Sequence, residues 1–257
     1  MTTLAPRLAF VAAESDDARA AAAALTERYG HHEPHEADVI VPLGGDGMML
    51  QTLHRFMSTG KPAFGMNRGS VGFLMNDFDL ESLPKRIARA ETTAIHPLLM
   101  RAEDTEGQIH TAHAVNEVSL LRQSHQAAKL KIAIDGRPRL DQLVCDGVIV
   151  STPVGSTAYN LSAHGPILPL NAQLLALTPI SAFRPRRWRG ALLPSSVAVT
   201  ITTLERDKRP VAAAADNVEI RRIVQVEICE DTAKTCLIMF DPDQPWNERI
   251  LTEQFTY

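Results

Sequence analysis

The sequence predicts two domains, an α/β domain at the N-terminal end followed by a mostly β domain. Up to about residue 92, short apolar runs alternate with segments that carry apolar residues at helical spacing. That alternation is typical of a parallel sheet covered by helices. After residue 93, β-branched runs such as V-A-V-T-I-T-T and V-Q-V-E-I-C lie between turn signals. We therefore expect an α/β domain at residues 1–92 and a β-rich domain at residues 93–240.

The elements of the first domain can be placed from their boundary residues. Ser15 or Asp16 can cap the alanine-rich helix that follows, and Pro84 suits the first turn of another helix. Met49 and Leu53 belong to a set of apolar residues at helical spacing. The expected elements are a strand at 7–12, a helix at 16–29, a strand at 38–43, a helix at 48–58, a strand at 63–66 and a helix at 83–91.

The second domain is expected to contain strands joined by tight turns. D-G-R-P at 135–138 is one such turn signal, placed between two strand-like runs. The closing segment 241–257 is less strand-like and carries Trp246 and Phe255. It is a candidate to return to the first domain, a choice that the sequence alone leaves open.

Composition excludes several classes of protein. The chain has 257 residues, 45% hydrophobic and 22% charged, with a net charge of -4, which does not favour nucleic-acid or membrane-surface binding. The three cysteines, Cys145, Cys229 and Cys236, lack C-x-x-C spacing, which favours a reducing compartment. The N-terminus lacks a secretory signal pattern, and no run approaches the roughly 20 apolar residues of a membrane span. We expect a cytoplasmic protein.

The run Gly44-Gly45-Asp46-Gly47 lies where a strand is expected to give way to a helix. Glycines there let the backbone approach a ligand closely, and a helix N-terminus favours phosphate or ribose oxygens. The dinucleotide fingerprint fails at Leu50, and no Gly-Lys-Ser/Thr of a phosphate-binding loop follows. Asp46 could therefore hold Mg²⁺ or accept a proton from a sugar hydroxyl. The alternative is that Asp46 only caps the helix.

A second polar stretch, D-G-V-I-V-S-T-P-V-G-S-T-A-Y-N-L-S-A-H-G-P, occupies residues 146–166. Its hydroxyls and backbone N–H groups predict a neutral hydrogen-bonding wall for a nucleoside or sugar, with the Tyr159 ring as a stacking surface. Asp146, at the head of the strand, could accept from an amine or ribose hydroxyl. The alternative is an ordinary turn-rich loop.

Asn116 and Glu117 interrupt an apolar strand in A-V-N-E-V-S-L-L. Burying both side chains costs free energy unless each finds a partner. Adjacent strand residues face opposite ways, so both can serve one ligand only near a strand end or a bulge. A surface pair with satisfied hydrogen bonds is the alternative.

Taken together, these three motifs resemble the NAD kinase family in order and approximate spacing, across essentially the whole chain. Further stretches look like its alphaproteobacterial members, among them H-G-P-I-L at 164–168, F-R-P-R-R-W-R-G at 183–190 and the closing F-D-P-D. G-G-D-G alone is shared with lipid kinases and phosphofructokinases. The serine-threonine motif is the specific one.

The resemblance implies transfer of the terminal phosphoryl of ATP, or of polyphosphate, to the 2′-hydroxyl of the adenosine ribose of NAD. It also implies a divalent ion, with Mg²⁺ expected, and a homodimer or homotetramer. Asp46 would accept the proton, and Gly44 and Gly45 would adjoin the phosphoryl donor. The residues implied to bind NAD are Asp46, Gly47, Asn116, Glu117, Asp146, Thr157, Ala158, Tyr159, Asn160, Leu161 and Ser162. Asp216, in A-A-A-A-D-N, stands where many relatives have an Asp-Gly-Gln-like turn and is not among the predicted site residues.

Two other functions share parts of this pattern: a G-G-D-G kinase of a lipid or sugar, and a catalytically idle NAD(H) sensor. The first lacks support because no amphipathic membrane-binding stretch is evident, and the intact Asp46 argues against the second. The histidines at 31, 32 and 35 could suggest a metal, but we expect solvated side chains, and no protein metal ligand is predicted. The basic run 184–189 is expected to be a phosphate or subunit contact, or a solvated face, rather than a nucleic-acid site.

Overall fold

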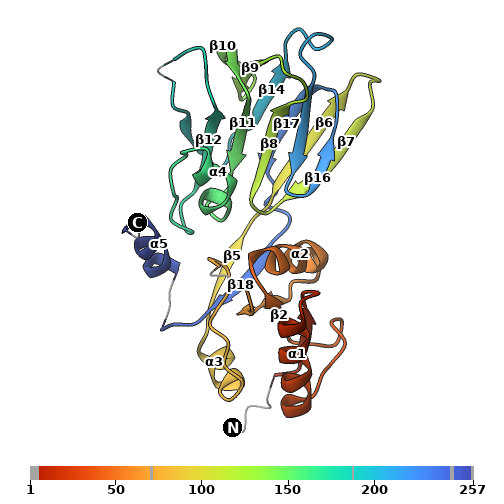
Figure 1. Cartoon of the computed structure of the whole chain (residues 1–257), viewed down its shortest axis with the longest axis vertical. Coiled ribbons are helices and arrows are strands. Elements are labelled where there is room, and N and C mark those ends of the chain that lie inside the picture. Colours follow the sequence, from red (N-terminus) through yellow and green to blue (C-terminus); the bar gives the residue numbers. More distant parts are fainter. Residues whose placement is uncertain (1–5, 70–71, 187, 244–245, 256–257) are drawn as a thin grey trace. The chain divides into compact units, whose positions relative to one another are not determined.

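The computed structural model describes residues 6–69, 72–186, 188–243 and 246–255. The chain forms two compact units, one of Met1–Ile95 with Ala233–Tyr257 and the other of His96–Thr232. Figure 1 colours these segments along the chain, so that the first unit contains both the red and the dark blue ends. An α/β unit and a mostly β unit confirm the predicted fold class.

The first unit is built on a six-stranded sheet with the order β1-β2-β3-β18-β5, in which β4 also pairs with β2. The pairs of β1 with β2, β2 with β3, β2 with β4 and β3 with β18 are parallel, whereas β5 runs antiparallel to β18. Its strands are β1 (Leu8–Ala12), β2 (Val39–Gly44), β3 (Pro62–Ala63), β4 (Met66–Asn67), β5 (Glu91–Ile95) and β18 (Cys236–Phe240).

Helices cover both faces of this sheet. One core cluster joins Leu25 of α1 (Asp16–Tyr29) and Ile87 of α3 (Leu83–Arg89) to alternate residues of β2, such as Val41. On the opposite face, Ile40 packs with Phe56 of α2 (Asp46–Phe56). Burial of both faces explains why β2 reads as a continuous apolar run rather than an alternating one.

Several predicted boundaries differ from the structure. The helix expected at 48–58 begins at Asp46, because Gly45 takes the N-cap position, and its last turn continues as a 3₁₀ turn (Met57–Thr59). The single strand expected at 63–66 is two short strands, β3 and β4, separated by Phe64 and Gly65. The strand β18, which the predicted boundary gave to the β-rich domain, lies between β3 and β5 in the first unit.

The closing segment lies in the first unit and ends in helix α5 (Trp246–Phe255). Trp246 is buried, with its ring 5.7 Å from that of Phe240 and 6.4 Å from that of Phe73. Aromatic contacts at these distances stabilise packing beyond the area that they bury. The C-terminal helix is therefore anchored against the residues that follow β4 and against β18.

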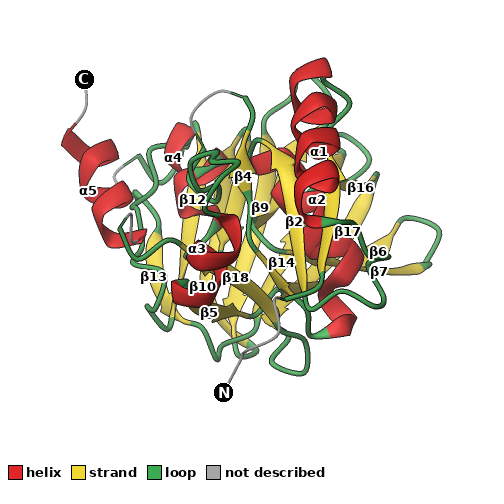
Figure 2. Cartoon of the chain, turned by 90° about the horizontal axis from the view of Figure 1, so that it is seen from below, coloured by secondary structure: helices red, strands yellow, loops and turns green. Residues whose placement is uncertain are grey.

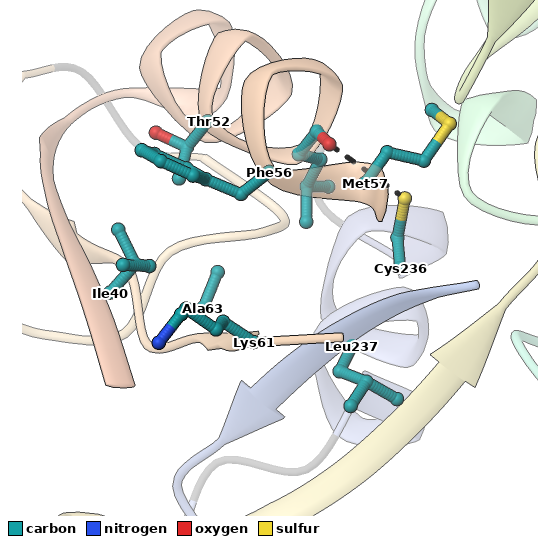
Figure 3. A pocket seen from close by; sticks show the side chains of 9 residues that line it. Ile40, Thr52, Phe56, Met57, Lys61, Ala63, Cys236 and Leu237 are labelled. Carbon is teal, nitrogen blue, oxygen red and sulfur yellow. Dashed lines mark hydrogen bonds between the residues drawn. The ribbon is translucent and has the colours of Figure 1, made fainter. Parts of the chain in front are cut away.

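A small cavity of about 10 Å³, enough for about one water molecule, lies between α2 and the sheet (Figure 3). It is lined by Ile40, Thr52 and Phe56 on one side and by Cys236 and Leu237 of β18 on the other. The Cys236 thiol lies 3.9 Å from the carbonyl oxygen of Leu53.

The second unit consists of two antiparallel sheets. One has the order β10-β9-β14-β17-β6-β7 and the other the order β13-β12-β11-β8-β15-β16. Apart from a 3₁₀ turn (Gly155–Thr157) and the four-residue α4 (Tyr159–Ser162), its described residues are strand and loop (Figure 2). Its strands are β6 (Leu98–Asp104), β7 (Ile109–Ala114), β8 (Glu117–Arg122), β9 (Ala128–Ile134), β10 (Arg137–Cys145), β11 (Gly147–Ser151), β12 (Leu174–Ile180), β13 (Ala191–Pro194), β14 (Val199–Thr203), β15 (Val211–Ala215), β16 (Val218–Ile220) and β17 (Ile223–Glu230).

The two sheets share one core. Alternate residues of the strand pair β9 and β14, such as Ile132 and Ile201, form one buried cluster with Leu120 of β8 and Val148 of β11. This is the arrangement of a β sandwich. The predicted turn at 135–138 is confirmed: Asp135 and Gly136 have φ of 50° and 72° and join β9 to β10, as a two-residue hairpin requires.

Candidate active site

Asp46 is the first residue of helix α2, directly after the turn that ends β2. Gly44 has φ of 157°, and a Cβ there would lie 2.9 Å from the Cβ of Met48 and 3.0 Å from that of Ala13, so this turn needs glycine. A Cβ at Gly45 or Gly47 would meet nothing within 4 Å. Gly44 therefore allows the sharp turn, and Gly45 and Gly47 leave open space beside the backbone on either side of Asp46 in the sequence.

The Asp46 carboxylate is held by backbone N–H groups from another segment. Phe73 N donates to Oδ2 at 2.8 Å and Leu74 N to Oδ1 at 2.9 Å. The helix N-cap is Gly45, which makes no side-chain cap, so the interpretation of Asp46 as a simple helix cap is wrong. A carboxylate oxygen has two lone pairs, so each oxygen retains one for a ligand or a proton.

Space around this carboxylate is tight on one side. A Cβ at Gly72 would lie 2.4 Å from Oδ1 of Asp46, a distance that side chains do not adopt. Gly72 therefore allows the 72–74 backbone to approach closely enough for its N–H groups to reach the carboxylate. The sequence motifs did not predict this role for Gly72.

In the second unit, Asn116 and Glu117 lie at the start of β8, as two adjacent residues facing one ligand would require. Asp216 holds this corner: its carboxylate accepts from the N–H groups of Val115 at 2.7 Å and of Asn116 and Glu117 at 3.1 Å each. Sequence reasoning omitted Asp216. The signal available was a carboxylate ending the apolar run of β15, where it needs polar partners.

Glu117 is half-buried, and its Oε2 atom is buried without a hydrogen-bond partner among the described residues. Burial, with a further contribution from the negative charge of Asp216, raises the pKa of the Glu117 carboxyl to about 7. A buried polar oxygen without a partner costs free energy that a ligand hydroxyl or amine can recover. Glu117 is therefore suited to contact a polar ligand.

The hydroxyl-rich loop after β11 differs from the expected hydrogen-bonding wall. Thr152 and Ser156 are buried, and Thr152 donates from Oγ1 to the carbonyl oxygen of Val115 at 2.7 Å. Ser156 donates to Pro153 O at 2.6 Å and accepts from Leu168 N at 2.9 Å. These hydroxyls fix the loop against the Asn116 corner, because short hydroxyl side chains readily bond to nearby backbone.

Asn160 is also an internal residue. Its side chain is fully buried, donates from Nδ2 to the carbonyl oxygens of Ser156 at 3.1 Å and Pro166 at 2.9 Å, and accepts from Thr178 Oγ1 at 2.7 Å. A Cβ at Gly165 would lie 2.1 Å from its Oδ1. The Asn160 amide therefore fixes the loop, which leaves only its backbone for a ligand.

The remaining predicted loop residues are accessible to a ligand. Thr157, Ala158 and Leu161 are half-buried, Ser162 is exposed, and Tyr159 is 36% exposed. Asp146 differs in position: it precedes β11, whereas the loop follows the other end of that strand. Its carboxylate accepts from Arg122 Nε at 2.6 Å and is about half exposed. Within this unit the structure brings together Asn116, Glu117 and the loop, but not Asp146.

The histidine cluster and the basic run 184–189 show no further site among the described residues. The described residues hold no group of three or more His, Cys, Asp or Glu side chains that could bind a metal, and His31 accepts from the N–H of Phe10 at 3.3 Å. No helix among them is long and apolar enough to cross a membrane. Arg187 of the basic run lies outside the described residues, and the other arginines of that run are exposed.

Comparison with known proteins matches each unit to a domain of one enzyme family. Residues 7–94 match the ATP-NAD kinase N-terminal domain, and residues 115–238 match the ATP-NAD kinase C-terminal domain. The chain is 61% identical to an NAD kinase of Rhizobium meliloti, over 97% of each chain. It is 56% identical to one of Hyphomonas neptunium, over 98% of each.

Two solved structures share the fold. A yeast NADH kinase complexed with NADH superposes with a TM-score of 0.84 at 21% identity, covering 99% of this chain and 88% of that one. An NAD kinase from Archaeoglobus fulgidus in complex with ATP has a TM-score of 0.77 at 22% identity, covering 97% and 100%. Fold and domain matches together define a phosphotransferase. The chain belongs to the NAD kinase family, as the sequence motifs predicted, and the lipid-kinase and sensor alternatives are not favoured.

Proposed function

We propose that Asp46 is the proton acceptor when this NAD kinase transfers the terminal phosphoryl of ATP to the 2′-hydroxyl of the adenosine ribose of NAD. The observation that carries this assignment is a carboxylate fixed by two backbone N–H groups, with open space beside it at Gly45 and Gly47. A ribose hydroxyl is a weak nucleophile, and a carboxylate within hydrogen-bond reach can take its proton as the new O–P bond forms. Fixing the carboxylate in advance reduces the reorganisation needed at that step.

For the phosphoryl donor, we propose a position beside Gly44 and Gly45, at the N-terminus of α2. Backbone N–H groups and the positive end of a helix favour phosphate oxygens. The Archaeoglobus fulgidus relative is described in complex with ATP, which supports ATP as donor. Mg²⁺ in such sites is usually bound by substrate phosphates and water with one or two carboxylates, so we expect the phosphates of ATP to hold it.

For NAD, we propose as contact residues Gly47, Asn116, Glu117 and residues 157–162. Glu117 supplies an unpartnered carboxylate oxygen, and Tyr159 supplies a partly exposed ring on which a base can stack. The yeast relative is described with NADH bound, which supports a nicotinamide dinucleotide as ligand.

We propose a homo-oligomer in which Asp146 contacts the NAD bound by a neighbouring copy of the chain. It lies at the opposite end of β11 from Ser151, which pairs with Glu117, and a strand of that length spans roughly 15 Å. Asp146 and Glu117 can contact the same part of one ligand only if they come from different copies of the chain. Mixing an Asp146→Ala variant with an Asp46→Asn variant tests this, since mixed oligomers would regain activity that neither variant has alone.

We propose the cytoplasm as the compartment of this enzyme. Cys145, Cys229 and Cys236 form no disulfide, and two of them are buried, which suits a reducing environment. Cell fractionation with an antibody to the native chain tests the proposal; recovery outside the soluble cytoplasmic fraction would contradict it.

The proposed role of Asp46 is tested by Asp46→Asn, which keeps the shape but removes proton acceptance. With NAD, ATP and Mg²⁺, we expect turnover to fall by roughly 100-fold or more, while NAD binding measured by calorimetry stays close to wild type. Asp17→Asn, an exposed residue of α1, is the matched control and should leave turnover unchanged. Wild-type turnover in Asp46→Asn would refute the proton-acceptor role.

A further inference from the structure

The segment that holds Asp46 is itself held by a side chain from the C-terminal helix. Arg249 of α5 donates from Nη1 to the carbonyl oxygen of Phe73 at 2.9 Å and also to that of Met75. Phe73 and Leu74 in turn donate their N–H groups to the Asp46 carboxylate. A continuous path of hydrogen bonds therefore runs from the Arg249 guanidinium through residues 73–75 to the reacting carboxylate, all within the first unit.

A second contact fixes the other end of the same segment. Arg249 Nη2 donates to Oδ1 of Asn76 at 2.9 Å, and Asn76 is fully buried. Asn76 donates from Nδ2 to the carbonyl oxygens of Gly65 and Met239, both at 3.1 Å, which joins the segment to the sheet. Arg249 thus binds residues 73, 75 and 76 at once, as the rigid fork of a guanidinium allows and a single point charge does not.

The electrostatic setting favours this role. Arg249 is half-buried, and burial is the main reason why its pKa lies below the usual value for arginine. The negative charges of Asp77, Asp46 and Asp241 act in the opposite direction and favour the charged guanidinium. Keeping the Arg249 guanidinium charged away from water costs free energy of desolvation. Its hydrogen bonds to the carbonyl oxygens of Phe73 and Met75 offset that cost.

Helix α5 does not depend on Arg249 alone for its place. Trp246 packs on Phe73 and Phe240, and Arg249 itself lies over the Phe240 ring at 5.2 Å. The apolar contacts of Trp246 remain when the guanidinium is removed. Substitution of Arg249 is therefore expected to loosen the 73–76 segment without releasing the helix.

We propose that Arg249 is a positioning residue for catalysis, which acts on Asp46 through the backbone of residues 73–75 rather than by touching substrate. The proposal rests on the proposed role of Asp46. It assigns a catalytic contribution to the C-terminal helix, far along the chain from the glycine-rich turn. Loss of the guanidinium frees the Phe73 and Leu74 N–H groups to move, so the carboxylate no longer has one fixed orientation toward the acceptor hydroxyl.

The test compares Arg249→Gln with wild type in two measurements. Steady-state kinetics should show kcat reduced by about 10–100-fold with KM for NAD nearly unchanged, because misplacement of the carboxylate affects the transition state more than binding. Amide hydrogen exchange measured by NMR should be at least about tenfold faster at Phe73 and Leu74, while amides of β2 exchange at the wild-type rate. Arg249→Lys, which keeps the charge but loses the fork, should restore part of kcat.

Arg55→Gln is the matched control, since Arg55 is an exposed arginine on α2 that lies over the Phe56 ring. It should leave kcat and both exchange rates unchanged. In an Asp46→Asn background, Arg249→Gln should lower kcat further by less than about threefold, since the two residues act as one unit. A general loss of folding would instead lower kcat equally in both backgrounds.

The outcomes separate the two proposals. If Asp46→Asn is inactive but Arg249→Gln keeps the wild-type kcat, or leaves exchange at Phe73 and Leu74 unchanged, the role of Arg249 is refuted and that of Asp46 stands. Wild-type turnover in Asp46→Asn refutes the proton-acceptor role, and the role of Arg249 falls with it.

Discussion

Asp216 and Glu117 are joined by two hydrogen bonds that run in opposite directions. The N–H of Glu117 donates to Oδ1 of Asp216, and the N–H of Asp216 donates to the carbonyl oxygen of Glu117, both at 3.1 Å. Asp216 has φ of 48°, a conformation that aspartate tolerates better than most residues. These two hydrogen bonds hold the start of β8 against the end of β15. They thereby fix the position of Glu117, whose side chain we propose to contact NAD.

The first prediction concerns Asp216→Asn. The substitution removes the charge and places an N–H₂ group near three backbone donors, so at least one of them loses its acceptor. We expect the free energy of unfolding to fall by about 1–3 kcal/mol in urea denaturation. Asp207→Asn, at an exposed position of the same unit, should change it by less than about 0.5 kcal/mol. Equal effects of the two substitutions would show that the corner does not depend on Asp216.

The second prediction concerns the pH dependence of stability. The pKa of Glu117 is raised from 4.5 to about 7, so the folded state favours its neutral form. The stability that this group contributes is fully present below pH 4.5 and is lost as pH rises through about 7. Glu117→Gln does not titrate, so between pH 4.5 and pH 8 the variant should gain on the order of 2–3 kcal/mol relative to wild type.

Urea denaturation of both proteins at several pH values measures this difference. Glu227→Gln, on an exposed position of β17, is the control and should follow the wild-type curve. A constant difference between Glu117→Gln and wild type across this range would mean that the folded and unfolded proteins ionise Glu117 alike.

The third prediction concerns Asn160, whose side chain joins three parts of the hydroxyl-rich loop and β12. Asn160→Ala leaves Thr178 Oγ1 and the carbonyl oxygens of Ser156 and Pro166 without this partner. We expect a loss of about 2–4 kcal/mol in the free energy of unfolding, because buried polar groups are left unpaired. The exposed Asn217→Ala provides the comparison and should be nearly neutral. If Asn160→Ala instead weakens NAD binding with stability unchanged, Asn160 is a ligand residue rather than an internal one.

The fourth prediction concerns Gly72→Ala. The added Cβ would lie 2.4 Å from Oδ1 of Asp46, so either the carboxylate or the 72–74 backbone must shift. We expect kcat to fall by about 10–100-fold in the standard assay, with the melting temperature little changed. Gly69→Ala adds a Cβ that meets only ordinary contacts, the nearest at 3.9 Å from Gly45 N, and should retain turnover. Turnover of Gly72→Ala at the wild-type rate would show that the position of the Asp46 carboxylate is not critical.

Local pattern in the sequence was sufficient for the fold class, most helices and the family. The cap at Ser15, the periodicity of α2 and the turn at Asp135–Gly136 all depend on residues within one element or its immediate flanks. Motif order then identified Asp46, Asn116 and Glu117 as candidates, and the structure places Asn116 and Glu117 at a strand start as that interpretation required.

What supports these side chains was decided only by the tertiary structure. The Asp46 carboxylate accepts hydrogen bonds from the N–H groups of Phe73 and Leu74, and Arg249 donates to the carbonyl oxygen of Phe73. Asp216 accepts from the N–H of Glu117, and β18 completes a sheet begun more than two hundred residues earlier in the chain. Within the hydroxyl-rich loop, Thr152 and Ser156 are turned inward onto the backbone, since a buried loop must satisfy its own backbone first, whereas Thr157 and Ser162 are half-buried and exposed. Periodicity and motifs show which polar and apolar side chains a chain has and in what order. A hydrogen bond between residues distant in the sequence exists only once folding has brought donor and acceptor to within about 3 Å.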